Sequence, residues 1–283
     1  MRARIWITSS AVAAVAMTTL AMSPARAEQP TGPKFAMERG HVNTLAGVKN
    51  LVDHGGPVLP AADLYAIWWG PASGFPADAQ SRMTTFFTGF GSSDLLQIAR
   101  QYMHGAKPTA TYVRAFFDTS TPTAKPSSTG LAAEIKKVLD ANKTSADPNG
   151  IYVVFTSTFP KGSSYCAWHN GATVNGKAIA EAFMPNPDGV QGCATPNDYP
   201  TQLSPISDAT RSLADSTSHE LMESITDPQP NGNTLAWIDN GGGEIADKCE
   251  WLYGGPVSIG GLNWEVQEEW SNAISGCVQY SQP

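Results

Sequence analysis

The residues best suited to chemistry form a His-Glu-x-x-Glu motif at His219, Glu220 and Glu223. We predict that this motif lies on a helix spanning residues 208–225. On a helix, residues four positions apart project from one face about one turn apart. His219 and Glu223 could therefore bind one metal ion together, and Glu220 would point beside them as a candidate general base.

The choice of metal follows from the types of the ligands. In zinc peptidases with the motif His-Glu-x-x-His, the first Glu is the general base, which assigns this role to Glu220 here. The second His is replaced by Glu223. Zinc accepts carboxylate oxygen at nearly the same distance as imidazole nitrogen, so Zn²⁺ remains the expected ion. The more anionic ligand set is also compatible with another divalent metal.

Catalytic zinc takes three protein ligands and keeps one position open. The acid-rich stretch 237–249 supplies a third candidate in Glu244, which lies 25 residues after His219. Asp247 could receive the other ring N–H of His219 and fix its tautomer. The roles of Glu244 and Asp247 could also be exchanged.

His169 is the remaining histidine with a possible role. It lies three residues after Cys166, in a segment that a disulfide could hold rigid. There it could donate a hydrogen bond to an oxyanion or serve as an alternative metal ligand. The simpler interpretation is a histidine on a surface loop.

Four cysteines, an even number, favour two disulfides in an exported chain. The pairs Cys166–Cys193 and Cys249–Cys277 are favoured because each closes a short loop, although the sequence leaves three pairings open. A zinc site made of the four cysteines is the competing idea. It is disfavoured because no C-x-x-C spacing occurs.

Residues 1–27 read as a secretory signal peptide. Arg2 and Arg4 precede an apolar run, and the small residues Ala25 and Ala27 fit a cleavage site near Ala27. No second stretch approaches the length of a membrane span. We therefore expect a secreted protein, extracellular or periplasmic, with no membrane span in the mature chain.

The charge of the mature chain limits its partners. Without the three arginines of the signal peptide, 15 basic residues stand against 25 acidic ones, which gives a net charge of about −10. Nucleic-acid binders need a positive footprint, so this class is disfavoured, as is an anionic membrane surface. A neutral or cationic partner or a metal ion is expected, and the protein is expected to be a monomer.

Strands and helices alternate irregularly along the chain, which favours one α/β or α+β domain over residues 56–283. Residues 28–55 read as an N-terminal arm or pro-segment. The periodicity of apolar residues predicts strands and helices in the following ranges. Strands are predicted at 63–70, 111–117, 151–156 and 178–184, and helical spacing covers 77–104, 131–142 and 208–225.

Several motifs carry a family resemblance. Residues 218–228, 237–239 and 244–249 resemble secreted microbial proteins that share S-H-E-L-x-E-x-x-T-D-P, G-W-x-D and G-E-I-x-D-x-C. Residues 63–70 and 165–169 resemble the plant phosphate-induced, or EXORDIUM, family. Together these stretches extend over roughly residues 50–250, and the pattern from 218 onward is the most specific.

The microbial resemblance implies a secreted zinc metallopeptidase with a zincin-like fold, in which a mixed sheet packs on the active-site helix. Its partner would be a peptide or protein substrate. The plant resemblance implies instead a non-catalytic extracellular or cell-wall protein. A third hypothesis is a secreted carbohydrate-binding module that stacks sugars on tryptophans. Candidates for that role are Trp68, Trp69, Trp251 and Trp264, for most of which core packing is the simpler interpretation.

Overall fold

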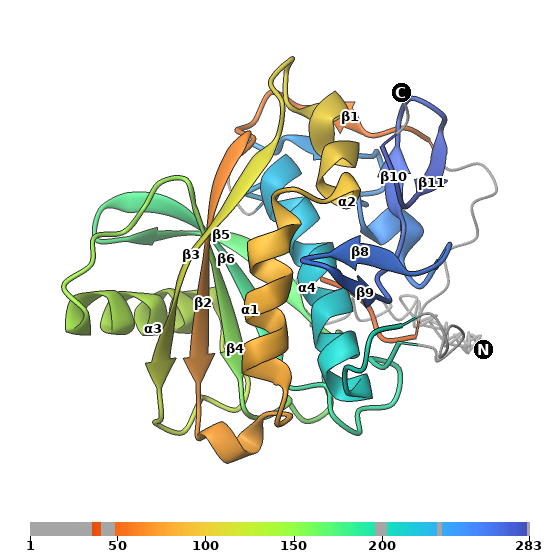
Figure 1. Ribbon diagram of the computed structural model, residues 1–283. Coiled ribbons are helices and arrows are strands. Elements are labelled where there is room, and N and C mark those ends of the chain that lie inside the picture. Colours follow the sequence, from red (N-terminus) through yellow and green to blue (C-terminus); the bar gives the residue numbers. More distant parts are fainter. Residues whose placement is uncertain (1–35, 41–48, 196–202, 231–233, 282–283) are drawn as a thin grey trace, which may run out of the picture. The chain divides into compact units, whose positions relative to one another are not determined.

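Five strands form one mixed sheet in the computed structural model, which describes residues 36–40, 49–195, 203–230 and 234–281. They are β2 (Ala61–Trp69), β3 (Thr109–Asp118), β4 (Gly150–Thr156), β5 (Trp168–Val174) and β6 (Lys177–Pro185). Their order across the sheet is β3-β2-β4-β6-β5 (Figure 1). The first four are parallel to one another, whereas β5 runs antiparallel to β6 at the edge. This is a mixed sheet with one antiparallel edge.

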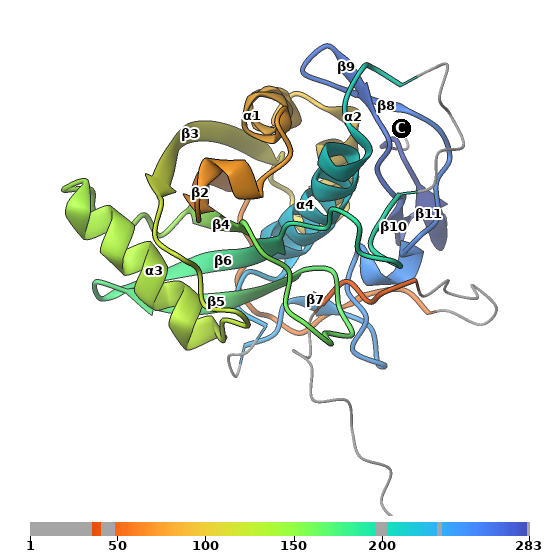
Figure 2. The same cartoon turned by 90° about the horizontal axis from the view of Figure 1, so that it is seen from below.

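Helices cover both faces of the sheet (Figure 2). The helices α1 (Ala79–Phe90) and α4 (Asp208–Thr226) lie on one face, and α3 (Ser128–Ala141) lies on the other. Every residue of β4 is buried, as expected for a central parallel strand with both faces covered. The described elements belong to one compact α+β unit, residues 32–283.

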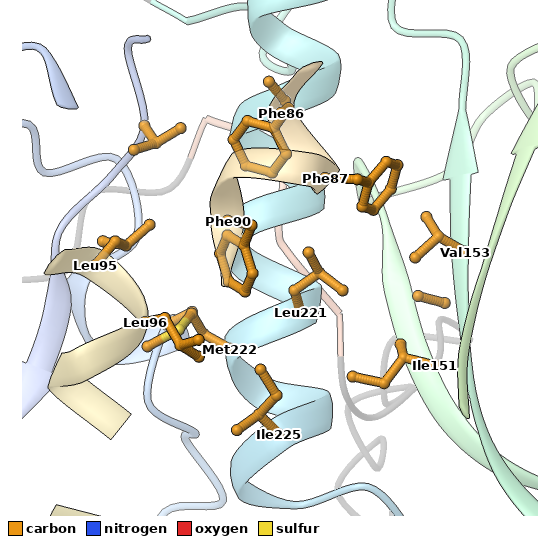
Figure 3. Packing of buried hydrophobic residues seen from close by; sticks show 14 of the residues in the cluster. Phe86, Phe87, Phe90, Leu95, Leu96, Ile151, Val153, Leu221, Met222 and Ile225 are labelled. Carbon is orange, nitrogen blue, oxygen red and sulfur yellow. The ribbon is translucent and has the colours of Figure 1, made fainter. Parts of the chain in front are cut away.

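The core between the sheet and α4 is largely aromatic and aliphatic (Figure 3). Helical spacing places Phe86, Phe87 and Phe90 of α1 toward α4 and the sheet. From α4, Leu221 and Met222 face them. All of these side chains are buried, and each contributes about 1.5–3 kcal/mol to folding by leaving water. This packing fixes the position of α4 on the sheet.

The ends of α4 are defined by local chemistry. The Ser207 hydroxyl caps the helix by accepting a hydrogen bond from the Thr210 amide at 3.3 Å. The Asp78 carboxylate, at the start of α1, accepts hydrogen bonds from the Ser207 amide and hydroxyl, at 2.8 and 2.6 Å. The helix ends before Asp227-Pro228, as predicted. Asp78 thereby ties the start of α4 to α1.

Smaller elements complete the unit. They are α2 (Asp94–Gln97), the 3₁₀ helices η1 (Ala72–Gly74), η2 (Ile98–Tyr102) and η3 (Asp247–Cys249), and the antiparallel pairs β1 (Val52–Asp53) with β7 (Trp237–Ile238), β8 (Val257–Ile259) with β9 (Leu262–Trp264), and β10 (Glu269–Ser271) with β11 (Gly276–Val278). Disulfides join Cys166 to Cys193 and Cys249 to Cys277, which confirms the favoured pairing.

Most of the predicted elements are present. The short strands β1 and β7–β11 were not predicted, and two further differences concern longer elements. The helical spacing over 77–104 is divided into α1, α2 and η2, because the chain turns at Gly91 and Ser92. The strand β5 was not predicted, since its Trp-His-Asn-Gly-Ala-Thr-Val sequence lacks a clear apolar run.

The two disulfides are compatible with an extracellular protein. The predicted signal peptide, residues 1–27, lies outside the described residues. Among the described residues, no helix has both the length and the apolar character that crossing a membrane requires.

A buried acid between β6 and α3 gives a test of the fold. Glu181 is fully buried, and its Oε1 accepts a hydrogen bond from the Ser128 hydroxyl. Burial raises the pKa of Glu181 to about 8. The folded protein therefore keeps a proton that the unfolded chain releases near its ordinary pKa of about 4.3. Stability from this group is complete below that value and is lost as the pH rises toward 8.

We expect the unfolding free energy of the wild type to fall relative to that of Glu181→Gln between pH 5 and 8. The slope should reach up to about 1.4 kcal/mol per pH unit, because the glutamine carries no proton to lose. Urea denaturation across this range measures it, with the exposed Asp188→Asn variant as control. A pH-independent difference between wild type and Glu181→Gln would contradict the expectation.

Candidate metal centre

The predicted motif lies in the middle of the structure. His219, Glu220 and Glu223 are all fully buried on α4, and almost every other residue of this helix is buried too. The helix packs against α1, η2 and the sheet. Of its polar residues, Glu220 lies beside His169 of β5, while His219 and Glu223 contact residues between Asp247 and Gln267. Buried carboxylates are costly unless they are paired, so this face of the helix calls for an explanation.

One group of possible ligands surrounds His219. Its Nε2 lies 3.1 Å from Oε1 of Glu223 and 3.5 Å from Oδ1 of Asp247. The three side chains meet the geometric requirement for holding one metal ion, with their ligand atoms within 4.8 Å of one another. The backbone amide of Asp247 also donates to Oε1 of Glu223 at 3.2 Å, which holds the two carboxylates together.

A second group surrounds His169, which the structure places on β5 and not on a surface loop. Its Nδ1 lies 3.1 Å from Oε2 of Glu220 and 3.2 Å from Oε2 of Glu223. These three side chains are fully buried and also satisfy the geometry of a metal site. Glu223 thus belongs to both groups.

The observed separations fit metal coordination. Charge-assisted hydrogen bonds between N and O atoms are usually about 2.7–2.9 Å long. Ligand atoms held tetrahedrally at about 2.0–2.1 Å from zinc lie roughly 3.3–3.4 Å from one another. The four contacts that define the two groups span 3.1 to 3.5 Å, which is compatible with ligands around one ion, although the contact of His169 with Glu220 also has the length of a hydrogen bond. The donor set of imidazole and carboxylate also suits Zn²⁺ or a similar divalent ion.

In both histidines, the ring nitrogen that does not face Glu223 makes a hydrogen bond that orients the ring. Nδ1 of His219 lies 3.2 Å from Oε1 of Gln267, whose amide is fixed because its Nε2 donates to the carbonyl of Ala246 at 2.9 Å. Nε2 of His169 lies 3.2 Å from the carbonyl of Asp227. A ring N–H donated to each of these acceptors leaves the other nitrogen facing the carboxylates, which is the tautomer that a metal ligand needs.

Glu244 occupies a different place from the one predicted for it. Its Oε1 lies 3.6 Å from Nε2 of His169, while Asp247 contacts His219. Neither oxygen of Glu244 has a hydrogen-bond partner among the described residues, and the side chain is fully buried. The structure therefore brings Asp247, which sequence analysis gave as the exchangeable alternative, to His219 and Glu223. It places Glu244 on the side of His169.

A tight glycine-rich turn positions Glu244 and Asp247. The Asp239 carboxylate accepts hydrogen bonds from the amides of Gly241 and Gly243 at 2.7 and 3.0 Å. Gly242 between them has φ of +89°, a conformation that favours glycine. The turn ends where the Glu244 amide donates to Oδ2 of Asp247 at 3.1 Å, so both acids are fixed to one rigid loop.

The electrostatics of the centre show an excess of negative charge. Burial raises the pKa of Glu220 to about 7 and raises that of Glu244 well above its ordinary value. Burial acts in the same direction on Glu223, but His219 and His169 outweigh it and lower the pKa of that carboxyl to about 2. Glu223 is therefore the acid most strongly held in its ionised form, and it lies between the two imidazoles.

Residues 36–40, from the predicted N-terminal arm, cover the centre. We call them the covering segment. The amide of Met37 approaches Oε1 of Glu220 at 3.4 Å, and its carbonyl accepts from the amide of Cys166 at 2.7 Å. The amide of Arg39 donates to the carbonyl of Ser164 at 3.0 Å, so the segment pairs antiparallel with the residues that precede β5. The backbone at Met37 thus lies beside Glu220.

Sequence analysis did not assign roles to Gln267, Asp227 or Met37. Asp227 acts through its backbone carbonyl, which any residue type could supply, although it belongs to the Thr-Asp-Pro part of the motif. Gln267 lies 48 residues from His219 and has no distinguishing spacing. Their contacts arise only from the fold.

Comparison with known proteins gives no further guide, because no family model and no curated protein matches the chain.

Metal binding should contribute to stability. We expect treatment of the mature protein with a chelator to lower its melting temperature, and Zn²⁺ to restore it, because an ion that binds only the folded state stabilises that state. At a free concentration 100 times Kd the effect is about 2.7 kcal/mol, which corresponds to roughly 5–10 °C for a chain of this size. Scanning calorimetry measures the change. A melting temperature insensitive to chelator, in protein without bound metal, would exclude the centre.

Proposed function

We propose that this protein is a secreted metal-dependent hydrolase, and most specifically a metallopeptidase. One observation carries the proposal: His219 and Glu223, both buried on α4, meet the partly exposed Asp247 in one ligand group, with Glu220 one residue from the first ligand. The group joins one imidazole to two carboxylates, a donor set that zinc accepts. Secretion rests on the predicted signal peptide and is supported by the two disulfides.

Each residue has a proposed task. His219, Glu223 and Asp247 would hold the cation, which would supply Lewis-acid catalysis by polarising a carbonyl group and making a water molecule more acidic. Glu220 would accept a proton, for which a pKa of about 7, raised by burial, is well matched to neutral pH. His169, 3.1 Å from Glu220, would orient that carboxylate.

The covering segment supports a peptide as the substrate class. Its residue Glu38 forms an antiparallel bridge with Tyr165, flanked by backbone hydrogen bonds to residues 164 and 166, and the amide of Met37 lies 3.4 Å from Oε1 of Glu220. Extended peptides bind to strand edges by the same main-chain hydrogen bonds. A peptide substrate would therefore have to take the place of this segment.

A second candidate function is a non-catalytic extracellular protein with a structural metal. Complete burial of His219, Glu220 and Glu223 favours it, because structural metal sites are closed and catalytic ones keep an open position. The carbohydrate-binding alternative loses support, since Trp68, Trp69 and Trp264 are buried and cannot stack on a sugar. Trp251 is partly exposed, and its indole donates to the carbonyl of Glu38.

Cleavage of casein or a peptide library by wild type and Glu220→Gln tests the proposal. We expect the variant to lose about 10²- to 10⁴-fold in rate, the usual contribution of a general acid or base. Glu268→Gln is the matched control, because Glu268 is partly exposed and lies outside both ligand groups. Activity is measured before and after limited proteolysis, since the covering segment lies over Glu220.

The outcomes separate the two candidates. Bound metal with turnover that Glu220→Gln abolishes supports the peptidase. Bound metal without turnover, either before or after removal of the covering segment, would favour the structural role. Turnover in metal-free protein would contradict both.

A further inference from the structure

The two oxygens of Glu223 face different histidines. Oε1 lies 3.1 Å from Nε2 of His219, and Oε2 lies 3.2 Å from Nδ1 of His169. Each histidine has one further carboxylate beside the same nitrogen, namely Asp247 for His219 and Glu220 for His169. The centre therefore consists of two similar groups. Each has one imidazole and one carboxylate of its own, and the carboxylate of Glu223 belongs to both.

The two histidines also resemble each other in the hydrogen bond made by the ring nitrogen that faces away from Glu223. Gln267 accepts on the side of His219 away from Glu223, and the Asp227 carbonyl accepts on the side of His169 away from Glu223. In each case the neutral tautomer that donates to this acceptor turns a lone pair toward carboxylate oxygens. A lone pair facing two carboxylates at 3.1–3.5 Å is repulsive unless a cation lies between them. This holds for both histidines independently.

The number of acidic side chains around the two histidines also supports more than one cation. Four buried or largely buried carboxylates, those of Glu220, Glu223, Glu244 and Asp247, belong to the centre or contact its histidines. Each of the two groups places two of these carboxylates beside one imidazole, so each surrounds a possible cation with acidic side chains. Doubly protonated histidines would be expected to form shorter contacts, near 2.7–2.9 Å.

Glu223 and the unsatisfied atoms around it add an independent observation. Among the described residues, Nε2 of His219, Oε2 of Glu223 and both carboxylate oxygens of Glu244 have no hydrogen-bond partner, although all three side chains are fully buried. Such atoms are rare in a folded protein and indicate a missing ligand. Nε2 of His219 belongs to the first group, and Oε2 of Glu223 faces Nδ1 of His169 in the second. A single ion between His219 and Asp247 would leave Oε2 of Glu223 unexplained. Glu244 lies outside both groups, beside the opposite nitrogen of His169.

We propose that the centre holds two divalent cations bridged by the carboxylate of Glu223. One would be held by His219, Glu223 and Asp247, and the other by His169, Glu220 and Glu223. A bridging carboxylate of this kind fits the spacing of about 3.5–4 Å found in two-metal hydrolytic sites. The inference rests on the proposed metal site at His219. It changes the role of Glu220 from proton acceptor to ligand of the second cation.

The number of bound ions tests the inference directly. Full-length mature protein is stripped with chelator and titrated with Zn²⁺, and its content is measured by calorimetry and elemental analysis. We expect two equivalents in the wild type and in Glu268→Gln. We expect one equivalent in His169→Ala, His219→Ala and Glu220→Gln. In Glu223→Gln both ions should bind at least about tenfold more weakly, because both lose a ligand.

Mn²⁺ provides a second readout that does not depend on any variant folding. Two Mn²⁺ ions bridged by one carboxylate should give an exchange-coupled electron paramagnetic resonance spectrum in the wild type. His169→Ala should give the spectrum of an isolated ion. Circular dichroism of each variant shows whether it is folded.

One equivalent in the wild type, lost in both histidine variants, would overturn the two-cation centre and leave the proposed single-metal hydrolase standing. Two equivalents retained in Glu220→Gln would restore the proton-acceptor role of that residue and overturn its assignment as a ligand. No binding of Zn²⁺ or Mn²⁺ by wild type would overturn the inference and the proposed function together.

Discussion

The structure depends on the compensation of negative charge buried beside α4. Carboxylates leave water only when something positive or hydrogen-bonding replaces it, and an isolated buried charge costs many kcal/mol. Here Glu220 and Glu223 are placed on a helix whose other face packs in the main core, so they cannot turn toward solvent. The buried helix α4 therefore carries acidic side chains whose negative charge only a cation or bound protons can balance.

The surrounding elements hold these acids in fixed positions. Aromatic packing with α1 fixes α4 on the sheet, and the contact of Asp78 with Ser207 fixes where α4 begins. The edge strand β5 brings His169 from one side, and the turn organised by Asp239 brings Asp247 from the other. Three segments distant in sequence, namely α4, β5 and the turn that carries Asp247, therefore meet around Glu223. Such preorganisation is what metal binding requires.

Features that depend on residues close together in the sequence could be predicted, whereas contacts between distant residues could not. The helix 208–225 and the paired spacing of His219 and Glu223 are local properties, and they were predicted because the helical period expresses them directly. The disulfides were favoured correctly because short loops are the simplest closures. His169 was harder to interpret: its strand has no apolar run, and its meeting with Glu220 is a contact across 51 residues. The approach of Met37 to Glu220 across 183 residues had no sequence signal at all.

Each disulfide lies next to one of the two ligand groups. Cys166 precedes His169 by three residues, and Cys249 follows Asp247 by two. Reduction of either bond would loosen the segment that carries one ligand, since each crosslink closes a loop with a sequence separation of 27 or 28 residues. In the proposed metal centre, loss of either crosslink would therefore weaken the hold on an ion bound by that segment. The two disulfides would thus make the proposed centre sensitive to a reducing environment.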